Sequence, residues 1–344
     1  MNALMNSVST WDALAAVVWD IDPLFVQLGP LQFRYYGILF ALALMGGYSI
    51  FRWQYRRDGE DPEVAVRLTY WLIGGVIVGA RLGHVFFYEP SRYLADPIEI
   101  IKFWKGGLAS HGATIGLITV VAYYTWKVRR IPFRVIADRL AMAVPLATSC
   151  VRLGNFMNSE IVGRQTEVPW AFVFVRFDQN PRHPSQLYEV SMGLLLFLVM
   201  FLTDRYYDKR KLDRPLGLLT SLLLTGYFSM RFTVEFFKEY QGLDPSSSAL
   251  TEGQYLSIPF VLMGLVGFWA VLWGPWKGQT ARFFLERSGF TPIPATAGAT
   301  ATDDARNSGG DKSAGDAKRA ASKQPAERSE VEKKQRSLKR KKKR

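Results

Sequence analysis

Long apolar stretches alternate with short polar segments along the first 276 residues of the chain. A helix needs on the order of 20 apolar residues to cross the hydrocarbon core of a bilayer. Three stretches contain no Lys, Arg, Asp or Glu, and four more contain few ionisable residues, with 140–157 the weakest of them. The pattern therefore predicts seven membrane-spanning helices, at 35–51, 68–88, 106–126, 140–157, 185–203, 215–237 and 253–276.

The loop between the fourth and fifth predicted helices, about 159–184, has a different pattern. Residues 169–177 read Pro-Trp-Ala-Phe-Val-Phe-Val-Arg-Phe. Alternating β-branched and aromatic residues are typical of strands. We therefore expect a short pair of strands in a small extracytoplasmic insertion.

Basic residues are unevenly distributed over the predicted loops. Cytoplasmic loops of membrane proteins carry an excess of Lys and Arg. The first, third and fifth loops contain four, four and five of these residues, whereas residues 1–33 contain none and therefore lack the cationic start of a cleaved signal peptide. This bias places the N-terminus outside and the C-terminus in the cytoplasm, as an odd number of helices requires.

The composition divides the chain into two parts. Hydrophobic residues make up 49% of it, yet the mean hydropathy is only +0.01, because the C-terminal segment is rich in Ala, Ser, Lys and Pro. Residues 301–344 contain 15 of the 43 Lys and Arg residues, and such a segment cannot bury a core. We expect a membrane domain at 1–288, a disordered basic cytoplasmic tail at 289–344, and no nucleic-acid partner.

The ends of the apolar stretches carry ionisable residues, which cost at least about 2.5 kcal/mol at the centre of a membrane helix. Arg152 and Asn155 have the i, i+3 spacing of one helix face. Asn158 and Glu160 follow them, and Gly163 permits the turn that ends the segment. An Arg that reaches toward the membrane interface would explain Arg152 alone. The two Asn and the Glu beside it favour a functional site.

Arg231 and Glu235 in the sixth predicted helix are spaced i, i+4 and can pair, and Tyr227 extends their face. A purely structural ion pair explains this spacing equally well. His111 lies among glycines, and a histidine that takes up a proton near neutral pH is a candidate general base. A hydrogen bond or tight glycine packing between helices explains the same pattern.

Two arginines and one histidine at membrane depth suggest chemistry on a phospholipid. Guanidinium groups bind phosphate bidentately, and in a low-dielectric site they stabilise the charge on a leaving phosphate. The single cysteine and the three scattered histidines provide neither an internal disulfide nor a metal cluster. We expect an enzyme that cleaves or transfers part of a phospholipid.

Five ordered blocks lie between about residues 20 and 276. The blocks are Arg-Tyr-Tyr-Gly at 34–37, Gly-Gly-Leu-Ala-Ser-His-Gly at 106–112, Arg-Leu-Gly-Asn-Phe-Met-Asn-Ser-Glu at 152–160 with Gly-Arg at 163–164, Arg-His-Pro-Ser-Gln-Leu-Tyr-Glu at 182–189, and Gly-Tyr at 226–227 with Arg-Phe-Thr-Val-Glu-Phe-Phe at 231–237. Together they resemble the bacterial prolipoprotein diacylglyceryl transferases.

The resemblance implies a seven-helix enzyme of the cytoplasmic (inner) membrane. It would transfer the diacylglyceryl group of phosphatidylglycerol to the lipobox cysteine of prolipoproteins, forming a thioether and releasing glycerol phosphate, with no metal or organic cofactor. Its partners would be phosphatidylglycerol, the prolipoprotein signal peptide and the lipid bilayer.

The resemblance also implies roles for single residues. Arg152 would hold the lipid headgroup, Arg231 would neutralise the leaving phosphate, and His111 would help to form the thiolate. Because the acceptor cysteine comes with the substrate, Cys150 is not required for catalysis. The implied catalytic residues are His111, Tyr227 and Arg231, and the implied substrate-binding residues are Tyr36, Arg152, Asn155, Asn158, Glu160, Gly163 and Glu235.

Two positions depart from the family pattern. Ala113 stands where a second glycine commonly follows the histidine, and Tyr35 stands where the first helix often has Trp. Two other functions stay open, a lipid carrier or flippase that breaks no bond and a phospholipase in which His111 activates water. A carrier is expected to contain inverted repeats, and the two halves of the chain show no convincing correspondence.

Overall fold

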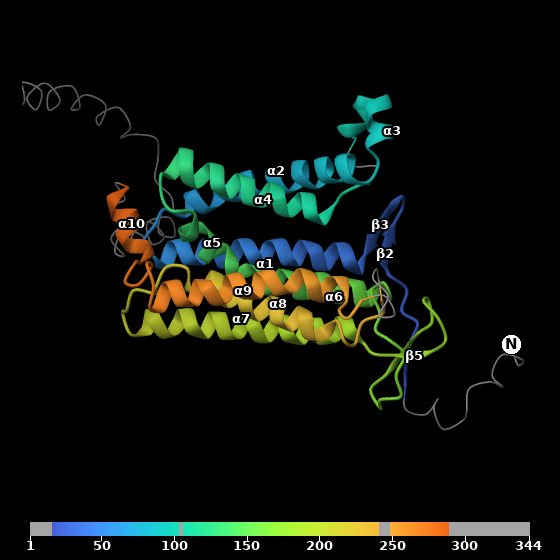
Figure 1. Cartoon of the computed structure of the whole chain (residues 1–344). Coiled ribbons are helices and arrows are strands. Elements are labelled where there is room, and N and C mark those ends of the chain that lie inside the picture. Colours follow the sequence, from blue (N-terminus) through green and yellow to red (C-terminus); the bar gives the residue numbers. More distant parts are fainter. Residues whose placement is uncertain (1–15, 103–105, 241–247, 289–344) are drawn as a thin grey trace, which may run out of the picture. The chain divides into compact units, whose positions relative to one another are not determined.

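The computed structural model describes residues 16–102, 106–240 and 248–288. These residues form long helices that lie side by side, with two small sheets at one end (Figure 1). The longer helices are α1 (Tyr35–Arg57), α2 (Pro62–Phe87), α4 (Ser110–Tyr123), α5 (Phe133–Ala141), α6 (Ala143–Met157), α7 (Ser185–Lys209), α8 (Leu218–Val234) and α9 (Glu252–Leu272). The short helical elements are α3 (Pro90–Ala95) and η1 (Pro97–Ile100) between α2 and α4, the π-helix η3 (Tyr124–Arg129) between α4 and α5, and α10 (Ala281–Arg287), which follows α9.

Helix occupies most of each predicted apolar stretch, and the weak stretch 140–157 falls on α6 and the end of α5. By length and composition α2, α7 and α9 can each cross a membrane, and α5 and α6, which meet at a bend of 42°, form a fourth candidate as one broken span. Helix α8 is a shorter apolar helix. A mostly helical protein with three or four such helices is therefore confirmed, whereas seven crossings stay a prediction. The predicted tail, 289–344, lies outside the described residues.

The predicted strand pair is present in the insertion between α6 and α7. Strand β4 (Phe172–Phe174) pairs antiparallel with β5 (Pro181–Arg182). A third strand, β1 (Val17–Trp19), joins β4 in parallel and was not predicted. Strands β2 (Leu24–Leu28) and β3 (Leu31–Arg34) form a separate hairpin that leads directly into α1.

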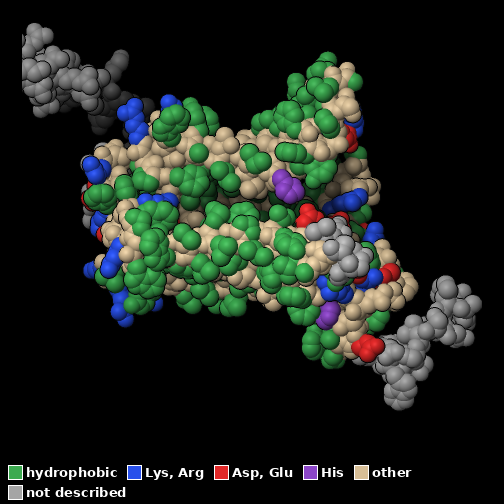
Figure 2. Space-filling view, viewed as in Figure 1, with side chains coloured by type: hydrophobic (Ala, Val, Ile, Leu, Met, Phe, Trp, Pro, Cys, Tyr) green, Lys and Arg blue, Asp and Glu red, His purple; other side chains and the backbone are tan. Residues whose placement is uncertain are grey.

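The helices have two chemically distinct ends. The sheets and α3 lie at one end, which we call the strand end, and α10 lies at the other, the basic end (Figure 1). The three loops rich in Lys and Arg, within 52–67, 127–134 and 205–214, all lie at the basic end, because α1, η3 and α7 end there. Between the ends, hydrophobic side chains cover much of the helical surface in view (Figure 2), as is expected of helices that face lipid.

Polar side chains fix where two of the long helices begin. Asp61 caps α2 by accepting a hydrogen bond from the backbone N–H of Glu63 at 2.9 Å, and proline follows at the first helical position. Thr251 and Gln254 form a capping box at the start of α9, where the Thr251 hydroxyl accepts from the Gln254 N–H at 3.2 Å. These caps satisfy backbone donors that lipid could not.

A seam of glycines joins α2 and α4. The backbones approach so closely that a Cβ atom added at Gly83 would lie 2.6 Å from the Gly112 Cα, and one added at Gly79 would lie 2.8 Å from the Gly116 Cα. Small residues at regular spacing permit this approach between membrane helices. The glycines after His111 thus serve helix packing, one of the two alternatives that the sequence left open.

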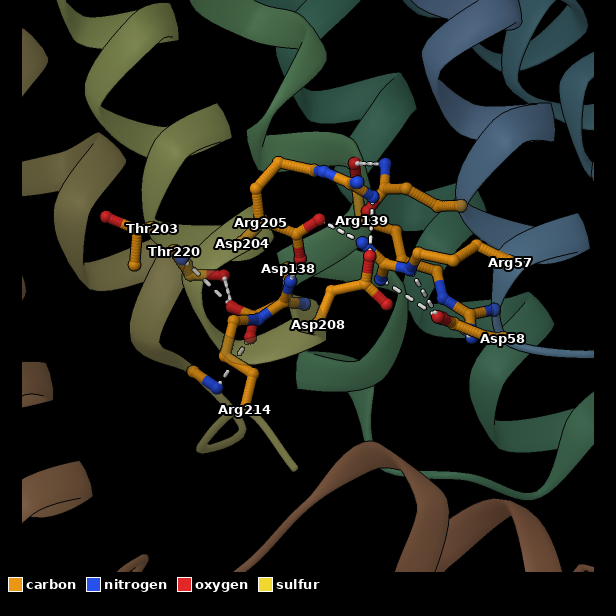
Figure 3. Close-up of polar contacts among 12 residues, drawn as sticks. Arg57, Asp58, Asp138, Arg139, Thr203, Asp204, Arg205, Asp208, Arg214 and Thr220 are labelled. Atoms are coloured by element: carbon orange, nitrogen blue, oxygen red, sulfur yellow. Dashed lines mark hydrogen bonds and ion pairs between the residues drawn. The ribbon is translucent and has the colours of Figure 1, made fainter. Parts of the chain in front are cut away.

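Buried ion pairs hold the basic end together (Figure 3). Arg139 on α5 pairs with Glu60 in the turn between α1 and α2, and each side chain is at most 3% exposed. Asp204 on α7, with 2% of its side chain exposed, pairs with both Arg57 and Arg214. Each carboxylate has a cation beside it, so the charges are compensated where water does not reach them.

Asp138 completes this network by capping α8 from another helix. Its carboxylate accepts hydrogen bonds from the backbone N–H groups of Gly217 at 2.8 Å and Thr220 at 2.9 Å (Figure 3). A negative charge is favourable at the positive end of a helix dipole. Gly217 has a φ of 100°, a conformation that side chains disfavour. The network therefore ties α5 to the start of α8.

The glycine seam makes a testable prediction about stability. We expect Gly79→Ala to lower the free energy of unfolding by roughly 1–3 kcal/mol, because the added methyl would press on the backbone of α4. Gly74→Ala on the same helix is the matched control, because no atom lies within 4 Å of its Cβ position. Thermal unfolding of the detergent-solubilised variants measures both effects, and an equal response at the two positions would contradict the seam.

Candidate functional site

Buried charges form a chain at the strand end. Arg152 on α6 pairs with Glu189 on α7. The Nζ atom of Lys238, just after α8, lies 3.6 Å from Glu189 Oε1 and 3.3 Å from Glu235 Oε1. Glu235 Oε1 in turn lies 3.7 Å from Nη2 of Arg231. Three cations and two carboxylates thus alternate in one ion-pair chain that joins α6, α7 and the end of α8.

The ion-pair chain is largely shielded from solvent. Lys238 is 3% exposed and Glu235 is 8% exposed, while the side chains of Arg152 and Arg231 are 16% and 26% exposed. Charges interact more strongly in such an environment than in water. The guanidinium groups of Arg152 and Arg231 can therefore bind an anion strongly there.

The predicted cluster around Arg152 is one hydrogen-bonded unit. Nη1 of Arg152 donates to Asn155 Oδ1 at 3.2 Å, so the two share a helix face as their spacing predicts. The Asn155 amide donates to one oxygen of Glu160 at 3.1 Å, and the Asn158 amide donates to the other at 3.2 Å. Because Arg152 pairs with Glu189, it does not behave as a lone arginine reaching toward the interface.

The insertion holds the end of α8 through backbone pairing. The Gly163 N–H donates to the carbonyl of His183 at 3.0 Å, and the Arg164 N–H donates to that of Phe237 at 2.9 Å. Nε of Arg164 donates to the Lys238 carbonyl at 2.8 Å. A Cβ atom at Gly163 would lie 2.7 Å from the Phe237 oxygen. Gly163 thus permits close approach of the insertion to α8.

The expectation that Gly163 permits a turn is wrong in detail. The left-handed residues that end this segment are Ser159 and Ile161, each with a φ of 56°. Glycine is required at 163 because a side chain would strike the backbone of the neighbouring segments, which a single sequence does not reveal.

Two cavities meet at Arg231. A small inner cavity lies between α6, α7 and α8, and an outer cavity of about 190 Å³ lies between α4, α8 and α9. Arg231 lines both. The residues that line the inner cavity are Thr148, Arg152, Glu189, Met192, Gly193, Tyr227, Met230 and Arg231. The outer cavity is lined by His111, Arg231, Glu235, Lys238, Glu239, Tyr240, Thr251, Glu252, Gly253 and Leu256.

These cavities bring together residues that the sequence placed in separate blocks. His111 from the start of α4 shares the outer cavity with Arg231 and Glu235, and Tyr227 shares the inner cavity with Arg152. The Glu235 carboxylate is fixed by the start of α9, where the Thr251 hydroxyl donates to its Oε2 at 3.2 Å.

Tyr36 is not among the residues that line either cavity. Its ring packs against α6 at Gly154, where an added Cβ atom would lie 2.7 Å from the Tyr36 Cδ2. Gly154 is two residues from Arg152, so Tyr36 lies beside the cluster of Arg152 in this structure.

The sequence interpretation missed Glu189 and Lys238. Glu189 appears there only as the last residue of the block at 182–189, and Lys238 lies just after the block that ends at 237. The spacing contained a signal, since Arg231, Glu235 and Lys238 follow one another at i, i+4 and i+7 and so lie on one face. Glu189 had no such signal because its partners come from other helices.

Arg81 binds backbone carbonyl groups rather than a carboxylate. Its guanidinium donates to four backbone carbonyl oxygens, those of Glu99 at 2.5 Å, Ile100 at 2.8 Å, Gly106 at 2.6 Å and Gly107 at 3.0 Å. These bonds hold the segment that leads into α4. Arg81 therefore fixes the backbone just before His111.

The described residues contain no group of three or more His, Cys, Asp or Glu side chains placed to hold a metal ion. The chemistry available in the two cavities comes from cations, carboxylates, tyrosine hydroxyls and one imidazole.

Comparison with known proteins identifies the family to which the chain belongs. The family model described as prolipoprotein diacylglyceryl transferase matches residues 23–270. This chain belongs to the prolipoprotein diacylglyceryl transferase family. Similar proteins named phosphatidylglycerol–prolipoprotein diacylglyceryl transferase occur in Tolumonas auensis, with 41% identity over 72% of this chain and 95% of the relative, and in Chloroherpeton thalassium, with 41% identity over 74% and 94%. One from Bacteroides fragilis is 42% identical over 73% of this chain and 94% of the relative.

The region shared with the transferase family contains the whole candidate site. Residues 23–270 include every residue of the ion-pair chain and of the two cavities. The resemblance that the five sequence blocks indicated is thereby confirmed.

The insertion provides a prediction about pH. Burial lowers the pKa of His183 below its ordinary value of 6.5. Its Nδ1 lies 3.0 Å from the Tyr188 hydroxyl, which accepts a hydrogen bond from Trp170 and can donate to a neutral imidazole. The folded state favours neutral His183, so this contribution to stability is complete above pH 6.5 and is lost as the pH falls through the folded-state pKa.

We therefore expect amide hydrogen exchange in residues 160–184, corrected for the intrinsic rate, to accelerate as the pH is lowered from 7.5 to 5. His183→Asn retains a polar side chain but cannot titrate, so its exchange should not show this acceleration. An identical pH profile in the variant would show that another group is responsible.

Proposed function

We propose that this chain transfers the diacylglyceryl group of phosphatidylglycerol to the thiol of the lipobox cysteine of prolipoproteins. A carbon–sulfur bond forms while the bond between the glyceryl carbon and the phosphate oxygen breaks, and glycerol phosphate leaves. The supporting observation is that Arg231 lines both cavities. It shares the inner cavity with Arg152 and the outer cavity with His111.

The cations of the ion-pair chain would bind the phosphate. Arg152 and Arg231 present planar guanidinium groups that match phosphate oxygens, and Lys238 adds a third positive charge. In the absence of lipid, Glu189 and Glu235 compensate these cations. A phosphate that enters the site brings its own negative charge, so the cations can pair with the phosphate in place of Glu189 and Glu235.

The same cations would favour the transition state. Negative charge grows on the leaving phosphate oxygen as its bond to carbon breaks. Fixed cations in a site with little water stabilise such charge, and loss of one comparable donor typically reduces kcat by about 10²–10³. Glu235 would keep Arg231 oriented through their contact and through its own bond to Thr251.

His111 would accept the proton of the peptide thiol. It lies at the start of α4 and lines the outer cavity together with Arg231. A free thiol has a pKa near 8.5, so it is mostly protonated at neutral pH and needs a base to become a nucleophile. Arg81 and the glycine seam would hold this imidazole in position.

The remaining residues would shape the lipid site. Asn155, Asn158 and Glu160 would support Arg152 through their hydrogen bonds, and Gly163 would allow the insertion to hold the end of α8. Tyr227 would line the inner cavity. Tyr36 would pack against α6 at Gly154 and form a wall beside the cluster of Arg152.

We also propose that seven helices cross the bacterial inner membrane, with the strand end outside and the basic end in the cytoplasm. The gathering of the three basic loops at one end supports this orientation, because Lys and Arg accumulate in cytoplasmic loops. The candidate site would then face the side on which exported prolipoproteins present their signal peptides.

The proposed activity can be tested with the purified full-length chain. Incubation with phosphatidylglycerol and a lipobox peptide should add one diacylglyceryl group to the peptide, as measured by mass spectrometry. Arg231→Ala should lower this rate by about 100-fold or more. Arg67→Ala is the matched control, because that arginine is 64% exposed at the basic end and should leave the rate unchanged.

The products separate this proposal from its rivals. Free diacylglycerol without modified peptide would indicate a phospholipase. No product from the folded wild-type chain, under conditions in which another member of the family is active, would instead favour a lipid carrier.

The role of His111 makes a separate prediction. His111→Gln should abolish most activity at pH 7 and recover part of it near pH 9, where the thiol ionises without a base. His84→Gln on the neighbouring helix α2 is the control and should stay active, because His84 is not among the residues that line the cavities. A loss of activity in His111→Gln that does not depend on pH would assign His111 an orienting role.

A further inference from the structure

A second basic site lies at the opposite end of the helices from the candidate active site. A cavity of about 620 Å³ opens between the end of η3 and α10. Arg130 and Arg287 line it from the two sides, and Trp126 and Phe284 contribute apolar walls. No Asp or Glu is among the described residues that line it.

The two arginines differ from the paired arginines of the buried network at this end. Within the described ranges, neither Arg130 nor Arg287 forms an ion pair, whereas Arg57, Arg139 and Arg214 are bound to carboxylates. The neighbouring cavity, between the end of α7 and α10, is lined by four cations and five carboxylates. The cavity at Arg130 is therefore positively charged without internal compensation.

The walls of this cavity are fixed. Leu285 of α10 is 4% exposed and packs in one hydrophobic cluster with Tyr124, the first residue of the π-helix η3, and Ile131, which follows η3. Arg130 has a φ of 53°, and its N–H donates to the Thr125 carbonyl, which closes the end of η3. The arginines are thus carried by two elements that share one packed core.

Aromatic side chains place the cavity at the depth of lipid headgroups. Trp126 is 71% exposed and has the Lys127 ammonium group 3.8 Å from its ring centroid, and Phe283 of α10 is 48% exposed. Tryptophan beside basic residues is typical of the boundary between the membrane and water.

We propose that this cavity binds the headgroup of an anionic phospholipid, with Arg130 and Arg287 on its phosphate and Trp126 against its glycerol backbone and upper acyl chains. The choice of a lipid over a soluble phosphate rests on the exposed aromatic residues. It also agrees with the proposed orientation, since the cytoplasmic leaflet is negatively charged. The site is separate from the transferase cavities and would anchor the basic end of the chain.

The test uses the full-length chain in detergent and native mass spectrometry, with phosphatidylserine as the probe because it is not the proposed substrate. The wild type should retain phosphatidylserine more tightly than phosphatidylcholine. The double variant Arg130→Gln/Arg287→Gln should bind phosphatidylserine roughly tenfold or more weakly, since each basic residue near an anionic surface contributes appreciably. Millimolar inorganic phosphate should not displace the lipid.

Two controls make the outcome decisive. Lys277→Gln/Arg282→Gln removes the same charge at the same end, but neither residue is among those that line the cavity, so binding should be retained. The Arg130→Gln/Arg287→Gln variant should keep the wild-type transferase rate, which shows that it is folded. Equal binding of phosphatidylserine by this variant and the wild type, equal binding of phosphatidylcholine, or displacement by inorganic phosphate would each overturn the proposal.

Discussion

The site depends on one electrostatic constraint, that charges buried among membrane helices need counter-charges. Arg152 and Arg231 each have a carboxylate partner, and Lys238 joins the two pairs into one chain. Removing one partner from a buried pair typically costs about 3–5 kcal/mol. The ends of α6, α7 and α8 must therefore pack together. This packing places the guanidinium groups of Arg152 and Arg231 beside the two cavities.

The scaffold carries His111 and the cations of the ion-pair chain on different groups of helices. His111 lies on α4, which is joined to α2 by the glycine seam, whereas the ion-pair chain belongs to α6, α7 and the end of α8. The α2–α4 pair meets the other helices in a hydrophobic cluster at the basic end that includes Leu68, Val121 and Ile136. At the strand end the two groups of helices enclose the outer cavity. A reaction between a lipid and a peptide needs such a place, where two substrates meet from different sides.

Much of the fold was predictable because membrane helices are specified locally. In lipid a long apolar stretch satisfies its backbone hydrogen bonds by forming a helix. The i, i+4 spacing of Arg231 and Glu235 likewise indicates that the two can pair. What escaped prediction depends on contacts between elements. Glu189 and Lys238 meet across helices, and Arg81 binds carbonyl groups of a distant segment. Gly163 is needed because the backbone of His183 and Phe237 lies close to it. The buried ion pairs of the basic end escaped for the same reason.

The arginines at the two ends are bound differently, and this difference argues for function. At the basic end Arg139 and Asp204 lie in closed networks in which each carboxylate has its cation and the role is structural. Arg231 at the strand end is held less tightly, because its Nη2 atom lies 3.7 Å from Glu235 Oε1, which is longer than a hydrogen bond. Arg231 also lines both cavities. A guanidinium group that can still donate hydrogen bonds into a cavity is suited to bind an anionic substrate there.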